Sequence, residues 1–226
     1  MNTIAISKQG QAWPSILVKA AMAVSGLGMA LWLTLHMLGN LLWLAGPEIM
    51  NTYGEKLHGS GVLWPVRLLI VAGLLVHVVG AVLTTRRAQL ARPIEYKRKK
   101  PVRELAALAS RSMRSTGVFL LAFLGYHVAS AYGAGHPGFI AGEFHHNLTG
   151  LLSSPLHALL LMAATTLITL HLGHGLASSW ITLGGESRRR QRLARKLCAR
   201  WTVFVTVGFV LPTVTYWSGR LLHALA

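Results

Sequence analysis

Four histidines are the side chains of this sequence best placed to carry out chemistry. His36, His77, His127 and His171 each lie in a different long apolar segment. Polar groups at membrane depth are costly unless they are paired or bind a ligand. A neutral imidazole is a good axial ligand of haem iron, and two imidazoles from different helices can hold one haem across a bundle. One histidine on each of four helices therefore predicts two bis-histidine b-type haems.

Small residues accompany all four histidines. Glycine and alanine let a flat macrocycle approach a helix backbone closely. The competing interpretation is a set of core histidines that only hydrogen-bond between helices, or a proton relay in a transporter. A relay normally recruits membrane carboxylates, and the predicted spans contain no Asp or Glu. The small residues are Gly39, Gly80, Gly125, Ala129, Gly173 and Gly175.

Five apolar segments must position these histidines. The chain has 226 residues, of which 53% are hydrophobic and 12% charged, too few polar residues to cover a soluble globule of this size. A helix needs roughly 20 apolar residues to cross the hydrocarbon core. The sequence therefore predicts a single all-α integral membrane domain over residues 1–226, with five transmembrane helices, of which four form a bundle that encloses two haems. The predicted spans are residues 16–44, 65–85, 116–132, 155–183 and 201–222.

The basic residues predict the orientation of the chain. The net charge is +16, and of 22 Lys and Arg residues ten lie in 86–114 and seven in 188–200. Both stretches separate apolar segments, so the positive-inside rule places them in the cytoplasm, with the N-terminus on the same side. This distribution indicates membrane topology and argues against nucleic-acid binding.

Depth along the helices tests which histidines can share a haem. With a rise of about 1.5 Å per residue, His36 lies roughly 30 Å from the inner end of its span and His77 roughly 12 Å from its own. These two cannot share a haem. His127 and His171 both fall at roughly 18 Å by the same count, so depth leaves their pairing open.

Several other side chains are candidates for supporting roles. His174 lies three residues after His171 on the same helix face, so it is an alternative ligand or a donor to a haem propionate. Arg111 and Arg114 stand at the inner mouth of the third span, where they either pair with propionates or serve the positive-inside charge bias. The remaining histidines are expected to be solvated: His58, His136, His145, His146, His157 and His223.

Motifs around the histidines resemble one membrane protein family. HMLGN in the first span, VHVVGA in the second, SRSMRSTG leading to GYHVAS in the third, and LHLGHGLASSWITLG in the fourth are combined here. NTYGEKLH and ARPIEY follow the first and second spans. Together these elements resemble the five-helix, di-haem cytochrome b subunit of succinate:quinone oxidoreductases, that is, of succinate dehydrogenase or fumarate reductase.

The resemblance implies the haem pairing. In that family the histidines of the first and third spans hold the distal haem, and those of the second and fourth spans hold the proximal haem. Here this pairs His36 with His127 and His77 with His171. The family motif also favours His171 over His174 as the ligand in the fourth span.

The resemblance also implies partners, substrate and location. The chain would anchor an FAD-containing flavoprotein subunit and an iron-sulphur subunit to the bacterial cytoplasmic membrane and pass electrons to quinone, with menaquinone the expected type. It would carry out no chemistry on succinate itself. The basic cytoplasmic loops suit the docking of such a partner. Quinone reacts near the distal haem in the family, so Glu48, Glu55 and Glu143 are candidates for exchanging its protons.

One position departs from certain fumarate-reducing relatives, which carry a Glu two residues before the fourth-span ligand. Thr169 stands there in this chain, so no compensating proton path is expected. Two alternatives to the family remain: a di-haem b subunit of a hydrogenase or formate dehydrogenase, whose histidines are placed differently, and a haem-free transporter or structural anchor.

Overall fold

The computed structural model describes residues 15–91, 105–184 and 187–225, and these residues are entirely helical or loop. The all-α prediction is therefore confirmed for the described residues. They form seven α-helices and one short 3-10 helix, η1 (Leu42–Ala45). Five helices are long: α1 (Ser15–Leu41), α3 (Leu63–Leu90), α4 (Leu105–Ala131), α6 (Pro155–Thr182) and α7 (Arg188–Leu225). Two are short: α2 (Pro47–Gly59) and α5 (Phe144–Ser153).

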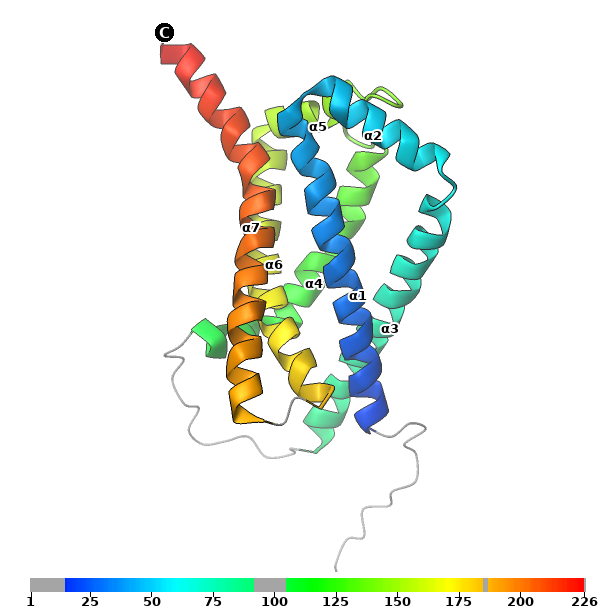
Figure 1. Cartoon of the computed structure of the whole chain (residues 1–226), viewed down its shortest axis with the longest axis vertical. Helices are drawn as coiled ribbons and strands as arrows, with labels where there is room; N and C mark the ends of the chain where they lie inside the picture. The colour runs from blue at the N-terminus through cyan, green and yellow to red at the C-terminus, as the bar shows by residue number, and fades with distance from the viewer. Residues whose placement is uncertain (1–14, 92–104, 185–186, 226) are drawn as a thin grey trace, which may run out of the picture.

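The five long helices run side by side along the long axis of the molecule, and α2 and α5 lie across one end (Figure 1). α1 packs against α3, α6 and α7, and α4 packs against α6. α2 packs against α5, so the two short helices cover the same end of the bundle. The connections on this end were predicted as loops, and each contains a helix instead, because both segments are amphipathic and can bury one face.

Four helices within the described residues are long and apolar enough to cross a membrane, which indicates a multi-pass membrane protein. They are α1 with η1, α3, α6 and α7. The predicted third span, 116–132, lies in α4, which is long but does not meet the same criterion. Arg114 and the polar residues Ser115, Thr116 and His127 lower the hydropathy of that helix.

Helix ends differ from the predicted span ends mainly on the basic side. α3 continues five residues past 85, α4 begins before 116, and α7 begins at Arg188 rather than at 201. Hydropathy detects only the apolar part of a helix, whereas the helix itself continues into polar residues. The ARPIEY motif, apart from its first residue, and the basic residues between 92 and 104 lie outside the described residues.

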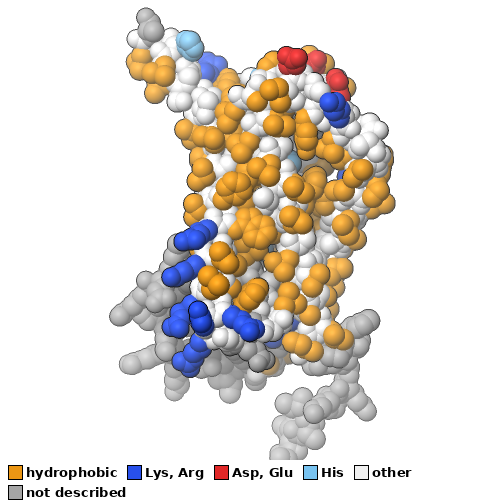
Figure 2. Space-filling model, viewed as in Figure 1, with side chains coloured by type: hydrophobic (Ala, Val, Ile, Leu, Met, Phe, Trp, Pro, Cys, Tyr) orange, Lys and Arg blue, Asp and Glu red, His pale blue; other side chains and the backbone are white. Residues whose placement is uncertain are grey.

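The flanks of the bundle are covered by exposed apolar side chains, as expected of helices that face lipid (Figure 2). Leu68 is 68% exposed, Leu69 73% and Val118 70%. Lys and Arg gather at the end where α1 and α7 begin, and the described Glu residues lie at the opposite end, near α2 (Figure 2). Among the described residues, the apolar band therefore separates a basic end from an end that carries Glu48, Glu55 and Glu143.

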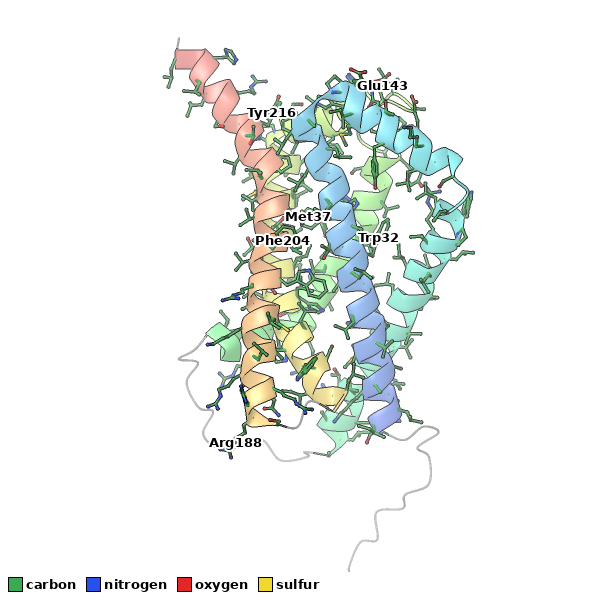
Figure 3. The ribbon with its side chains drawn as sticks, viewed as in Figure 1. Trp32, Met37, Glu143, Arg188, Phe204 and Tyr216 are labelled. Carbon is green, nitrogen blue, oxygen red and sulfur yellow. The ribbon has the colours of Figure 1, made fainter. Side chains whose placement is uncertain are left out.

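Close packing joins α7 to the rest of the bundle. Met37 of α1 is fully buried and meets Gly208 of α7, where a larger residue would have no room (Figure 3). The indole Nε1 of Trp201 donates to Thr34 Oγ1 of α1 at 2.9 Å. Pro212 lies inside α7, and the last turns of α7 lean away from the bundle (Figure 1).

Candidate functional site

The four histidines lie in two facing pairs inside the bundle. The rings of His36 on α1 and His127 on α4 have centroids 5.8 Å apart. The rings of His77 on α3 and His171 on α6 have centroids 6.2 Å apart. The pair His36/His127 is called the outer pair here, because it lies toward α2, and His77/His171 is called the inner pair. The two pairs use four different helices.

Hydrogen bonds fix the tautomers of the inner pair. His77 Nδ1 lies 3.0 Å from the carbonyl oxygen of Met22, which can only accept, so Nδ1 carries the proton. The Thr116 hydroxyl can donate to the Ser112 carbonyl at 2.9 Å, and its oxygen then accepts from His171 Nδ1 at 3.1 Å. With Nδ1 as the donor, Nε2 of each ring is the atom left to bind a ligand.

Two imidazole lone pairs on facing rings suit a metal ion between them. A nitrogen–metal bond of about 2 Å places the two nitrogens about 4 Å apart and the ring centres about 6 Å apart. The inner pair has a separation of 6.2 Å. Metal-binding histidines also usually donate their second N–H to a carbonyl or similar acceptor, as both rings do here. The donor set fits the iron of a b-type haem.

The outer pair fits the iron of a haem less completely. Its ring separation of 5.8 Å is suitable, but His36 Nε2 lies 3.2 Å from the amide nitrogen of Asn40, which donates to it. Asn40 would have to turn away before His36 Nε2 could bind a metal. His127 Nδ1 is buried and finds no acceptor among the described residues. Aromatic rings surround the pair, with Phe123 stacked on His127 at 5.5 Å.

The inner pair is packed against small residues. An added Cβ on Gly26 would stand 3.0 Å from the His77 ring, and one on Gly117 would stand 3.4 Å from the His171 ring. A larger residue at position 26 would therefore crowd the His77 ring, whereas a Cβ at position 117 would touch the His171 ring at an ordinary contact distance. Within the described part of the chain, no group of three or more His, Cys, Asp or Glu residues is arranged to hold a metal ion, so the two-histidine pairs are the candidate sites.

His174 and the two arginines lie near the inner pair but outside it. The ring that faces His77 belongs to His171, and His174 stands three residues later on α6, half-buried. Arg111 and Arg114 are exposed on the first turns of α4, within five residues of Thr116. They therefore lie on the basic side of the inner pair, where the sequence placed them.

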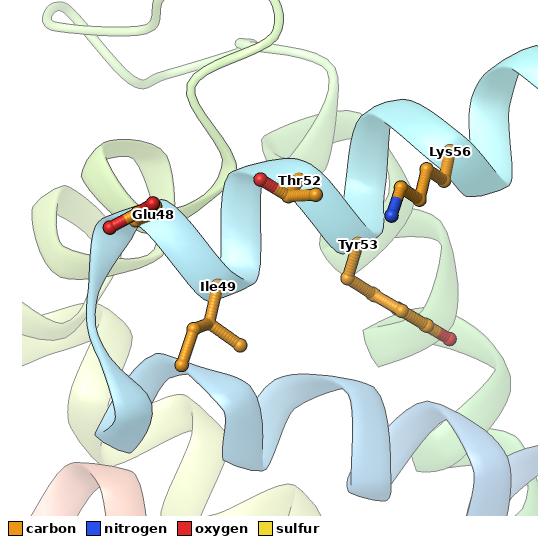
Figure 4. Close-up of a pocket in the computed structure, with 5 residues that line it drawn as sticks. All are labelled: Glu48, Ile49, Thr52, Tyr53 and Lys56. Atoms are coloured by element: carbon orange, nitrogen blue, oxygen red, sulfur yellow. The ribbon is translucent and has the colours of Figure 1, made fainter.

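The acidic candidates lie at the end of the bundle that carries α2 and α5. Glu48 lines a shallow depression on α2 with Ile49, Thr52, Tyr53 and Lys56 (Figure 4), and Glu55 is exposed on the same helix. The Tyr53 ring lies against Gly39, three residues after His36, so it links the depression to α1. Glu143 accepts a hydrogen bond from Asn51 at 2.7 Å, which joins the start of α5 to α2.

Two features of the site were not predicted from the sequence. His157 was expected to be solvated, and this was wrong: it is 4% exposed and lies 2.7 Å from the Tyr126 hydroxyl. His157 lies in the first turn of α6 and contacts α4 through Tyr126. Thr116 was missed because its partner is His171, 55 residues away, and sequence spacing carries no signal of such a contact.

No protein-family model matches this chain, and no curated protein or solved structure gives a match.

Proposed function

We propose that this chain is the di-haem cytochrome b membrane-anchor subunit of a succinate:quinone oxidoreductase. One observation supports the proposal most strongly: the inner pair, His77 and His171, faces across the bundle with both Nδ1 atoms hydrogen-bonded and both Nε2 lone pairs left for a metal. The motifs that resemble the family support the same assignment. Bound haem would supply a one-electron carrier at each pair.

In the proposed topology α4 is a fifth transmembrane helix. Its 27 residues are enough to cross the membrane, and it packs against α6, one of the four apolar candidate spans. The basic end lies in the cytoplasm, in keeping with the positive-inside rule (Figure 2). The N-terminus is then cytoplasmic and the end that carries α2 and α5 faces outward.

The two ends of the bundle then serve different partners. His77 and His171 would hold the proximal haem toward the basic end, where the iron-sulphur and flavoprotein subunits would dock. His36 and His127 would hold the distal haem toward the outer end. There the depression beside Glu48 and Tyr53 is a candidate site for menaquinone and for the exchange of its protons.

Purification of the chain from its own membrane with its companions tests this function. The companions are expected to contain one FAD-binding protein and one iron-sulphur protein, identified by mass spectrometry. Succinate should reduce the haem of the intact complex, and menaquinone should reoxidise it. If the companions were subunits of a hydrogenase or a formate dehydrogenase, the chain would be the cytochrome b subunit of that enzyme instead.

A second candidate function is a haem-free membrane anchor or transporter. One observation favours it: His77 ties α3 to α1 through Met22, and His171 ties α6 to α4 through Thr116, so both histidines also join helices. Dithionite reduction separates the two candidates, because a haem-free anchor shows no b-type absorption band.

Replacing Thr116 by valine should weaken the proximal haem site. Valine keeps the volume but removes the oxygen that accepts the His171 Nδ1 proton, and the loss of such a partner costs roughly 10- to 100-fold in metal affinity. The imidazole also becomes a weaker electron donor, so the midpoint potential of the proximal haem should rise. Redox titration and haem content measure both effects. Thr116→Ser keeps the acceptor and should behave like the wild type; equal behaviour of Val and Ser variants would contradict the assigned role.

Electron transfer across this chain should generate a membrane potential. Thr169, at the position where some relatives carry Glu, shares a hydrogen bond of 2.7 Å with Thr206 of α7. Hydroxyl groups of threonine do not take up or release protons at physiological pH, so this position provides no compensating proton path. A voltage-sensitive dye in proteoliposomes should report charging during turnover, and strictly electroneutral turnover would contradict the prediction.

A further inference from the structure

The first turns of α7 carry a row of basic residues on one side of the helix. Arg192, Lys196 and Arg200 are spaced four residues apart and are exposed. Residues at this spacing share one face of a helix. Ala194 stands on another side and is only 7% exposed, so α7 has a packed side and a free basic side in this region.

The same row continues into the apolar part of α7. Val203, Val207 and Leu211 follow Arg200 at the same spacing and are 59%, 55% and 42% exposed. This face is turned away from the bundle and toward lipid. The basic residues are in line with this face, so they project sideways from the helix, toward the headgroups of neighbouring lipids, rather than along the bundle axis.

The row reaches the headgroup layer at its end nearest the membrane. If Trp201 marks the boundary, then at 1.5 Å per residue Arg200 lies roughly 2 Å, Lys196 roughly 8 Å and Arg192 roughly 14 Å beyond it. The headgroup layer is about 5 to 8 Å thick on each side of the hydrocarbon core. Long side chains extend toward that layer, so Arg192 is also within reach. Residues 188–190 lie further out.

Two exposed leucines stand beside the basic row. Leu193 is 58% exposed and Leu197 is 53% exposed. They are four residues apart, and Leu197 is followed seven residues later by the exposed Phe204, so the three share one face. A helix with apolar side chains next to Lys and Arg is suited to the surface of a bilayer. An acidic protein surface would not account for the leucines.

We propose that Arg192, Lys196 and Arg200 bind the phosphate groups of anionic phospholipids in the leaflet at the basic end of the bundle. Lys and Arg near a membrane surface attract anionic lipids, and their N–H groups form charge-assisted hydrogen bonds with phosphate. The proposal depends on membrane insertion of α7 and is independent of haem, succinate and quinone. It assigns to α7 an interaction surface beyond the electron-transfer role.

Spin-labelled lipids test the proposal directly. The purified full-length chain, with its companions, is placed in phosphatidylcholine vesicles that contain spin-labelled phosphatidylglycerol or spin-labelled phosphatidylcholine. The ratio of the two association constants with the protein measures its preference for anionic lipid. The test variant carries Arg192→Gln, Lys196→Gln and Arg200→Gln. The matched control carries Arg188→Gln, Arg189→Gln and Arg190→Gln, which removes the same charge further from the bilayer.

The wild type should prefer phosphatidylglycerol, and the test variant should lose that preference by roughly fivefold or more, because each basic residue near the surface attracts anionic lipid. The control should stay within about twofold of the wild type, since surface charge attraction falls off within a Debye length. A further variant with Arg192→Lys and Arg200→Lys keeps the charge and should keep the preference. Equal losses in test and control variants would overturn the proposal. Retained lipid preference with release of the companion subunits would show a protein interface instead.

Discussion

Replacement of His171 by alanine is expected to leave one haem on each chain instead of two. His171 and His77 have ring centroids 6.2 Å apart, and each has its Nδ1 proton engaged, so the haem proposed between them needs both Nε2 lone pairs. His77→Ala should therefore give the same loss as His171→Ala, and the double variant should lose no more than either single variant. The measurement is haem content per chain together with the reduced-minus-oxidised spectrum.

His174→Ala is the control for this prediction. His174 has the same side chain and lies three residues further along α6, half-buried. It should retain both haems, because the ring that faces His77 is that of His171. If His174→Ala lost one haem and His171→Ala kept both, the ligand in α6 would be misassigned. Loss of both haems from a single variant that keeps its helix content would contradict independent sites.

Replacement of His127 by alanine should remove the other haem and stop electron transfer to menaquinone. His36 and His127 face each other at 5.8 Å toward the end covered by α2. The inner pair would stay intact, so succinate should still reduce the remaining haem while quinone reduction is nearly abolished. His36→Ala should give the same result. Stopped-flow spectroscopy separates the two steps.

His146→Ala is the matched control, because His146 is exposed at the same end of the molecule. It should keep both haems and full quinone reduction. Unimpaired quinone reduction by His127→Ala would mean that electrons leave from the inner pair, and the proposed direction of transfer would be wrong.

Hydropathy predicted the long helices but not their full lengths. The spans in α1, α3, α6 and α7 were found because each contains a long apolar stretch. The basic turns that begin α7 and the short helices α2 and α5 were missed, since their stability comes from packing one amphipathic face rather than from lipid. The same limit affected α4, which begins eleven residues before the predicted span.

The helix ends pair the histidines by depth better than the predicted span ends did. Counted from its true start at Leu105, His127 lies roughly 33 Å along α4, close to the roughly 31 Å of His36 from Ser15. His77 and His171 lie roughly 20 Å and 17 Å from the ends of their helices on the same side. One histidine on each of four helices was visible in the sequence, and the facing arrangement of the rings required the packed bundle.

Sequence patterns could not predict most hydrogen-bond partners of the histidines. Met22 accepts from His77 through a backbone carbonyl, which every residue has, and Thr116 is one hydroxyl among several in its helix. Asn40 is one turn from His36 and so could have been noticed from its spacing of four residues. Contacts between distant segments depend on how the helices pack and leave no periodic pattern.

The most direct test of the central claim is the ratio of haem to protein in the purified chain, measured by alkaline pyridine extraction and amino-acid analysis. The two histidine pairs predict two b-type haems per chain, both six-coordinate and low-spin by electron paramagnetic resonance. A chain purified in a folded state from haem-replete cells that contains no haem, or a single one, would contradict the proposed di-haem cytochrome.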